Sequence, residues 1–172
     1  MPYPIPENEA DRLDVLRGLD ILDTRAEPRF DTYTRAACEH FNVPMAQISL
    51  VDDDRQWFKS SCGLDCEGTP RHEAFCAFAL ISDDVIVIED ATKDDRFVNY
   101  RLVVRAPHVR FYAGAPLVYR KNIRLGTLCI SDDKPRTMSA KEVRDLARMA
   151  DAVSGEIWAW RTELERQTKA RG

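Results

Sequence analysis

Residues 45–62 have the sequence MAQISLVDDDRQWFKSSC, and here the hydrophobic period of the chain becomes two. From residue 45 to 51, apolar residues alternate with polar ones, which is typical of a strand with one buried face. Three aspartates at residues 52–54 form a charged turn, and residues 57–62 have the composition of a returning strand. The stretch therefore predicts an antiparallel β-hairpin.

Further helices and strands are predicted on both sides of this hairpin. Leucines at helical spacing indicate a first helix, and a proline suited to a first helical turn opens another at residue 28. Apolar runs bounded by acids or polar turns indicate three more strands. The elements expected beyond the hairpin are helices at residues 7–22, 28–41, 71–81 and 139–168 and strands at residues 85–89, 110–118 and 125–131.

The 172 residues are 44% hydrophobic and 31% charged, with a formal net charge of −4. This length suits a single domain over residues 1–172, with a core of about residues 28–138. The first residues lack the basic start and apolar stretch of a secretory signal, and apolar runs stay well short of the ~20 residues of a membrane span. We therefore expect a cytoplasmic protein that binds neither membranes nor, given its mildly acidic charge, nucleic acid.

The five cysteines are an odd number spread over most of the chain, which suits free thiols in a reducing compartment. Several possible zinc ligands lie within residues 62–76, but their spacing is wider than that of structural zinc sites, so we expect no metal. These residues are Cys62, Cys66, His72 and Cys76. A reversible disulfide between Cys62 and Cys66 is the alternative, because Gly63 allows the chain to bend between them.

The final helix, residues 139–168, carries the most regular pattern of the chain. Ser139 followed by Glu142 is a capping box, which starts the helix. Apolar residues then recur at spacings of three and four over about three heptads. Beyond residue 156 the helix outruns a strand-length partner, so its apolar seam is expected to pair with a second copy of the chain. The predicted homodimer contacts are Val153, Ile157, Trp160 and Leu164.

Strand alternation also places a set of polar residues on one face of the sheet. Gln47 and Ser49 point away from the apolar residues of their strand, and Thr127 and Cys129 do the same on a later strand. A covered polar face suits a small-molecule pocket, where a few hydrogen-bonding groups lie within apolar walls. The alternative is a sheet face that loops cover without any ligand.

Other candidate site residues come from the segments that should cover this face. Arg110 can bind a carboxylate or phosphate in bidentate fashion. The favoured account is charge pairing across the crossover, of Arg96 or Arg110 with Asp90, because partly buried charges are usually paired. Three phenylalanines either wall the pocket or fill core, and Cys76 is the thiol expected nearest a ligand. The candidate ligand-binding residues are Gln47, Ser49, Phe75, Cys76, Phe78, Asp90, Phe97, Arg110, Tyr112, Thr127 and Cys129.

The order of elements and a series of short motifs resemble those of GAF domains. The motifs are PENE at residues 6–9, ILDT at 21–24, SLVD at 49–52, RQWFKS at 55–60, AFCA at 74–77, EDA at 89–91, DRF at 95–97, RFYAGAPL at 110–117 and LGTLC at 125–129. The resemblance implies an α+β fold with a central antiparallel sheet. It places the N- and C-terminal helices on one face, and a short helix with loops over a pocket on the other.

The resemblance also implies a function. GAF domains are sensory modules of bacterial signal transduction, so a small-molecule-binding regulator without enzyme activity is expected, acting as a homodimer beside a histidine kinase or cyclase. No particular ligand or cofactor follows from the motifs, and cyclic-nucleotide binding through Arg110 stays open. A tetrapyrrole photosensor is disfavoured because Cys76 is not followed by histidine.

An enzymatic alternative also stays open. The chain resembles the GAF-type free methionine-(R)-sulfoxide reductases, which attack the sulfoxide with a thiolate and resolve the product with a second cysteine. Cys76 lies near the position where such an enzyme carries a cysteine. The remaining cysteines do not match the full pattern of that family.

Overall fold

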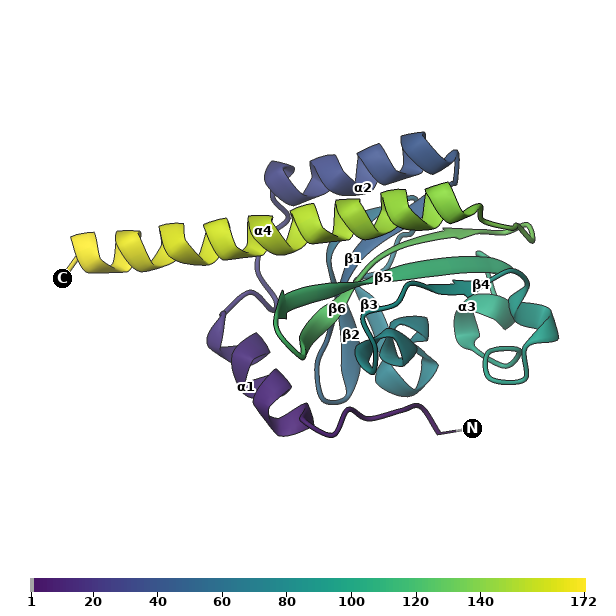
Figure 1. Cartoon of the computed structure of the whole chain (residues 1–172), viewed down its shortest axis with the longest axis horizontal. Helices are drawn as coiled ribbons and strands as arrows, with labels where there is room; N and C mark the ends of the chain where they lie inside the picture. Colours follow the sequence, from purple (N-terminus) through teal and green to yellow (C-terminus); the bar gives the residue numbers. More distant parts are fainter. Residues whose placement is uncertain (1) are drawn as a thin grey trace.

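The computed structural model describes residues 2–172, and its centre is a six-stranded antiparallel sheet (Figure 1). The strand order across the sheet is β3-β2-β1-β6-β5-β4. The strands are β1 (Met45–Val51), β2 (Arg55–Cys62), β3 (Gly68–Pro70), β4 (Ile86–Ile88), β5 (Phe111–Arg120) and β6 (Ile123–Asp132). The helices are α1 (Glu9–Gly18), α2 (Pro28–Phe41), α3 (Arg101–Val104), α4 (Ala140–Ala170) and the 3₁₀-helices η1 (Arg71–Glu73), η2 (Phe75–Leu80) and η3 (Ala91–Lys93).

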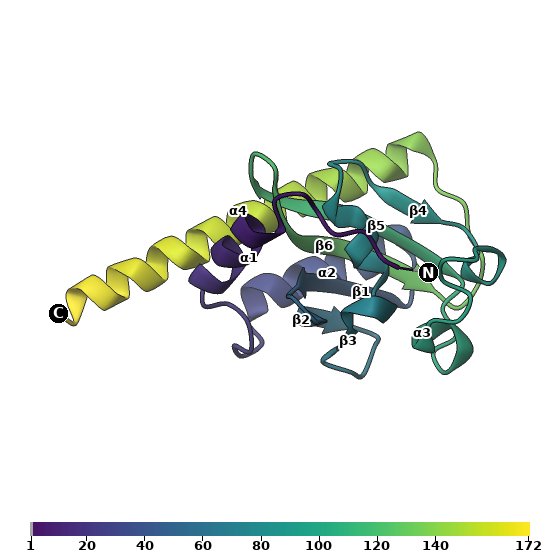
Figure 2. The ribbon, with the colours of Figure 1, turned by 90° about the horizontal axis from the view of Figure 1, so that it is seen from below.

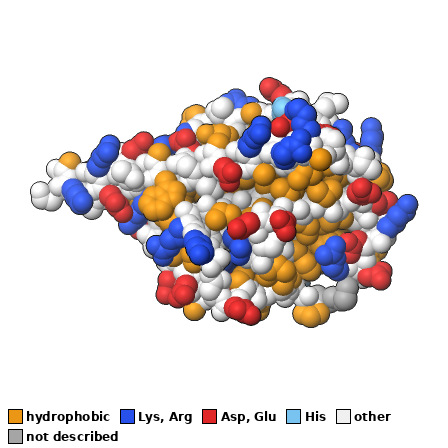
Figure 3. Space-filling model, viewed as in Figure 1, with side chains coloured by type: hydrophobic (Ala, Val, Ile, Leu, Met, Phe, Trp, Pro, Cys, Tyr) orange, Lys and Arg blue, Asp and Glu red, His pale blue; other side chains and the backbone are white. Residues whose placement is uncertain are grey.

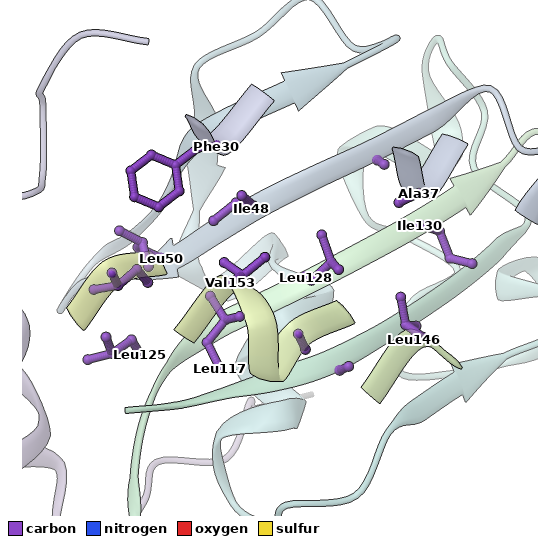
Figure 4. Close-up of a cluster of buried hydrophobic side chains, with 14 of the residues drawn as sticks. Phe30, Ala37, Ile48, Leu50, Leu117, Leu125, Leu128, Ile130, Leu146 and Val153 are labelled. Atoms are coloured by element: carbon purple, nitrogen blue, oxygen red, sulfur yellow. The ribbon is translucent and has the colours of Figure 1, made fainter. Parts of the chain in front are cut away.

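One face of the sheet is covered by α2 and α4, which lie side by side in both views (Figures 1 and 2). Their apolar side chains pack on those of β1, β5 and β6 to form the main core (Figure 4). Ile48 and Leu50 are fully buried there, as the alternation of β1 predicts. Full burial of such a side chain contributes about 1.5–3 kcal/mol, so this face supplies most of the apolar stabilisation. The predicted α+β fold with a central antiparallel sheet is confirmed.

The N-terminal segment is fastened by a buried charge cluster. Glu9 forms an ion pair with Arg12, with 2.8 Å between Oε2 and Nε, and a second with Arg71 of η1. Both arginine side chains are almost completely buried, and the ring of Tyr3 lies 5.3 Å from the Arg71 guanidinium. Burial opposes ionisation of Glu9, but hydrogen bonds from the two arginines outweigh it and lower its pKa below 4.5.

The long helix α4 begins with the predicted capping box: the Ser139 side chain accepts from Glu142 N, and the Glu142 side chain accepts from Ser139 N. Its first half packs on the sheet, and its last turns extend beyond the rest of the domain (Figure 1). Val153 and Ile157 are both 0% exposed within the main core. Their predicted contact with a second copy does not match this packing, because the sheet of the same chain already covers them.

The second half of α4 is held by ion pairs and carries the remaining seam residues. Arg29 at the start of α2 pairs with Glu156 and Glu163, with nitrogen–oxygen distances of 2.5 and 2.6 Å. Trp160 packs at the edge of the main core, and Leu164 is half-buried. Figure 3 shows mainly charged and polar side chains on the projecting end of α4. These two residues are therefore the part of the predicted seam that is not enclosed by the domain.

Several elements differ from the predictions in extent. The first helix ends at Gly18 instead of residue 22, because Asp20 and Asp23 adopt positive φ angles of 56° and 62°. The predicted helix at residues 71–81 consists of two 3₁₀-helices, η1 and η2, and β3 forms in a stretch where a loop was expected. None of the helices described between residues 2 and 172 combines the length and the apolar character needed to cross a bilayer.

Candidate functional site

The sheet face opposite α2 and α4 carries a second apolar cluster beneath η2, η3 and α3. Its centre is the ring of Phe75, the first residue of η2. This ring stacks on Tyr112 of β5 with 4.8 Å between centroids and 16° between planes. Phe97 and Tyr100 surround it at 5.0 and 5.4 Å. Gly114 contributes to this arrangement, because a Cβ there would lie 2.6 Å from the Tyr112 hydroxyl.

A small cavity lies between these rings and the polar face of the sheet. Its lining is Gln47, Gln56, Phe58, Leu64, Phe75, Leu102, Val109, Tyr112, Cys129 and Ser131. The free space is about 20 Å³, which is close to the minimum that holds one water molecule. The predicted pocket is therefore almost filled by the protein's own side chains.

Short hydrogen bonds join the polar residues at one end of this face. Gln56 Oε1 accepts from the Ser49 hydroxyl at 2.9 Å and from the Cys76 thiol at 2.7 Å. Gln56 Nε2 donates to Thr69 Oγ1 at 2.6 Å. Both the oxygen and the nitrogen of the Gln56 amide are therefore already hydrogen-bonded within the protein.

The polar groups at the other end are held more loosely. Gln47 Nε2 donates to Ser61 Oγ and Cys62 O, both at 3.4 Å, and the Tyr112 hydroxyl lies 3.4 Å from Thr127 Oγ1. Hydrogen bonds of this length are weak compared with the usual 2.7–3.0 Å. Gln47 and Tyr112 are therefore the polar groups of the cavity that are most easily redirected to a ligand.

The two buried cysteines of this face stay protonated near neutral pH. Burial raises the pKa of Cys76 to about 12 and that of Cys129 to about 11. A reductase of the kind considered above needs a thiolate to attack the sulfoxide. The chemistry of these two thiols therefore speaks against that enzymatic alternative.

The structure brings most of the predicted site residues together. Gln47, Phe75, Tyr112 and Cys129 line the cavity. Four further predicted residues lie directly behind this lining: Ser49, Cys76 and Thr127 in the hydrogen-bond network and Phe97 in the aromatic cluster. Phe78 is more peripheral, since it contacts Phe97 at 5.0 Å and is partly exposed.

Arg110 and Asp90 do not form the predicted pair. Arg110 Nη1 donates to the carbonyl oxygens of Val103 and Val109, both at 3.1 Å, so the guanidinium secures the crossover segment. Asp90 accepts from Thr92 N at 3.0 Å as the N-cap of η3. It lines an open groove of about 820 Å³ on the outside of the domain, away from the aromatic cavity. Neither residue lines the aromatic cavity, so the structure does not bring these two together with the other predicted site residues.

Six residues of the lining were not predicted. Gln56 and Phe58 alternate with Trp57 along β2, so extending the strand-alternation argument to this strand would have found them. Ser131 is also reachable by alternation, from Thr127 and Cys129 along β6. Of the other three, Leu64 and Val109 come from irregular segments and Leu102 from the four-residue helix α3, which is too short to show a hydrophobic period.

The structure contains neither of the two arrangements considered for the cysteines, the zinc ligand set and the Cys62–Cys66 disulfide, within residues 2–172. Within residues 2–172 no group of three or more possible metal ligands occurs, so the set around Cys62 and His72 is not assembled. Burial, together with the neighbouring Cys62 thiol, raises the pKa of Cys38 on α2 to about 12. Burial raises the pKa of Cys66. Both Cys62 and Cys66 are free thiols, so the suggested disulfide between them is not formed.

A curated relative shares most of this chain. Cyclic di-GMP phosphodiesterase PA2567 of Pseudomonas aeruginosa is 39% identical over 160 residues, which are 92% of this chain and 27% of the relative. The chain thus spans about a quarter of that protein's length. The prediction that the chain is not an enzyme is contradicted by this relative, whose name is that of an enzyme.

Solved structures and a family model agree on the fold. The GAF domain of a phosphoenolpyruvate-protein phosphotransferase from Coxiella burnetii superposes with a TM-score of 0.68 at 16% identity, covering 91% of this chain and 98% of that one. A domain of a putative two-component sensor histidine kinase from Sinorhizobium meliloti 1021 gives 0.66 at 19% identity, covering 84% and 99%. The family model described as GAF domain matches residues 25–157. The chain therefore belongs to the GAF domain family.

Proposed function

We propose that this GAF domain is the ligand-responsive part of a bacterial signalling system that controls cyclic di-GMP hydrolysis. The observation that carries the proposal is the cavity under η2, where Gln47 and Tyr112 face an aromatic cluster with only long hydrogen bonds. Such a mixture of apolar walls and a few polar groups is typical of small-molecule sites. The 39% identity with a cyclic di-GMP phosphodiesterase supports the choice of output.

The proposed signal leaves the domain through α4. Ligand binding rearranges η2, which packs on β5 and β6, and α4 packs on the opposite face of the same strands. Arg29 ties α4 to α2, so a shift of the sheet changes the angle of both helices. We expect two copies to associate through Trp160 and Leu164. The activity that this signal controls is a phosphodiesterase. A kinase is the alternative, because a domain of the Sinorhizobium meliloti sensor histidine kinase has the same fold.

Native mass spectrometry of the expressed protein tests the ligand and the dimer together. The expected result is a dimer that retains a small organic molecule. Leu164→Asp should shift the protein to the monomer, and Thr162→Asp, at an exposed position of the same helix, is the matched control. The proposal is contradicted if the protein is monomeric at its highest soluble concentration and retains no bound molecule after expression or after incubation with a cell extract.

A further inference from the structure

Phe75 occupies the position where an aromatic ligand ring would lie. We propose that its side chain is an internal plug, and that the ligand displacing it is an uncharged, planar aromatic molecule with an amide-like polar edge. This inference rests on the ligand-binding function proposed above and adds the chemical class of the ligand. Four observations carry it: the cage around the Phe75 ring, the space available, the charge of the lining and the loosely held polar groups.

The cage around Phe75 is built for a flat ring. Tyr112 lies nearly parallel to it at 4.8 Å, Tyr100 approaches edge-on at 5.4 Å, and Phe97 lies at 5.0 Å with its ring tilted by 36°. Stacked and edge-on contacts at these distances are favourable arrangements of aromatic pairs. Once the Phe75 ring leaves, the remaining three rings form a slot that another planar ring fills with the same contacts.

The space allows a ligand only when Phe75 moves. The free volume of about 20 Å³ holds no more than a water molecule, and Phe75 itself is one of the lining residues. Phe75 begins the six-residue 3₁₀-helix η2, a type of helix with poorer hydrogen-bond geometry than an α-helix. The plug is therefore attached to an element that rearranges more easily than the strands beneath it.

The charge of the lining excludes an ionised ligand. Among the described residues, all ten that line the cavity have uncharged side chains. Arg110 is engaged by two carbonyl oxygens, and Arg96 lies over Phe97 and Phe78 at the outer side of the cluster. A carboxylate or phosphate entering the cavity would lose its hydration without gaining a counter-ion, and an ammonium would find no carboxylate among the lining residues. The favoured ligand is therefore neutral.

The polar edge of the ligand follows from the loosely held groups. Gln47 Nε2 has only 3.4 Å contacts, and Gln47 Oε1 receives only a 3.7 Å contact from the Cys129 thiol. The primary amide of Gln47 thus offers both a donor and an acceptor. The Tyr112 hydroxyl, 3.4 Å from Thr127, is a further donor. A ligand with an adjacent carbonyl and N–H matches this set.

The test compares four small probes: benzamide, toluene, benzoate and tetramethylammonium. Their affinities are measured by calorimetry on the wild type, Phe75→Ala and Phe75→Ala/Gln47→Leu. Phe30→Ala is the matched control, since Phe30 is also fully buried but lies in the main core on the other sheet face. Phe75→Leu replaces Phe75→Ala if the smaller side chain prevents folding.

Removal of the plug should tighten benzamide binding by about tenfold or more, because the wild type binds only in its rare open state. In Phe75→Ala, benzamide should bind about tenfold better than benzoate, and Gln47→Leu should reduce its advantage over toluene by about threefold to tenfold. Phe30→Ala should take up toluene without preferring benzamide. Tighter binding of benzoate or tetramethylammonium than of benzamide overturns the inference, and so does unchanged benzamide affinity after removal of the plug.

These outcomes are separable from those of the proposed function. A charged molecule retained by the wild-type protein refutes the ligand class and leaves the sensory function in place. Selective binding of benzamide to the wild type at saturating concentration, without any change in oligomeric state or in α4, supports the site and refutes the signalling function.

Discussion

Removing the carboxylate that faces Lys59 should destabilise the protein strongly, although Lys59 lies outside the candidate site. The Lys59 side chain is 0% exposed, and its Nζ lies 2.6 Å from Glu27 Oε2, whose side chain is 30% exposed. The ammonium also donates to Thr24 Oγ1 at 2.8 Å and Arg25 O at 2.6 Å. Lys59 thus fastens the segment between α1 and α2 to β2.

Glu27→Gln leaves this buried ammonium without its counter-ion. Loss of one partner from a fully buried pair costs about 3–5 kcal/mol. The partial exposure of Glu27 and the two remaining oxygen acceptors of Lys59 reduce the expected loss to about 2 kcal/mol. For a chain of this length, that corresponds to a decrease of about 4–8 °C in Tm.

Urea unfolding followed by circular dichroism measures this loss of unfolding free energy, provided that the slope of the free energy against urea concentration is the same in wild type and variant. The matched control is Glu165→Gln in the exposed pair with Arg161, which should cost less than about 0.5 kcal/mol. Glu27→Gln/Lys59→Met should recover most of the stability, because a methionine packs against Phe30 and Trp160, the rings that now face Lys59. Equal losses in Glu27→Gln and Glu165→Gln, or a double variant less stable than Glu27→Gln, would refute the reasoning.

Three further predictions concern the charge cluster, the N-cap of α4 and the core contacts of α4. Glu9→Gln should destabilise the protein at pH 7. Because the folded-state pKa of Glu9 is lowered, the difference in unfolding free energy between wild type and variant should shrink as the pH falls below 4.5. Urea unfolding at several pH values measures this difference, and a difference that does not change with pH contradicts the prediction. Ser139→Ala should cost about 1 kcal/mol in the same assay through loss of the N-cap, whereas Thr162→Ala should stay within about 0.5 kcal/mol. Leu146→Ala should cost about 2–5 kcal/mol by leaving a cavity, and Leu164→Ala, at a half-buried position, should cost less than half as much; similar losses would mean that Leu164 is enclosed in solution.

Sequence patterns with a regular local spacing predicted the corresponding structural features correctly. The alternation in β1 assigned Ile48 to the helix-covered face and Gln47 to the opposite one, and both lie there. The capping box at Ser139 marked the start of α4 to within one residue. These features are local, since each depends on residues two to four positions apart.

Features that depend on packing between distant segments were not predictable in the same way. A heptad seam does not say which surface covers it, and for Val153 and Ile157 that surface is the sheet of the same chain. Phe75 was expected to wall a pocket or to fill core, but the near closure of the cavity depends on four aromatic rings from three segments: η2, β5 and the turn between η3 and α3. The pairing of Arg110 with Asp90 failed because the crossover offered it backbone carbonyls instead.

The length of α4 gives the domain the mechanical character of a lever. Its 31 residues span about 46 Å, and the 13 residues after Ile157 account for about 20 Å of this length. A tilt of about 10° around the last buried contact displaces the far end by about 3 Å, on the order of two residues' rise along a helix. Rearrangements too small to open the domain thus become large at the tip. Substitution of Arg29, which ties α4 to α2, should accordingly change how far the end of α4 moves when a ligand binds, while leaving the ligand affinity unaltered.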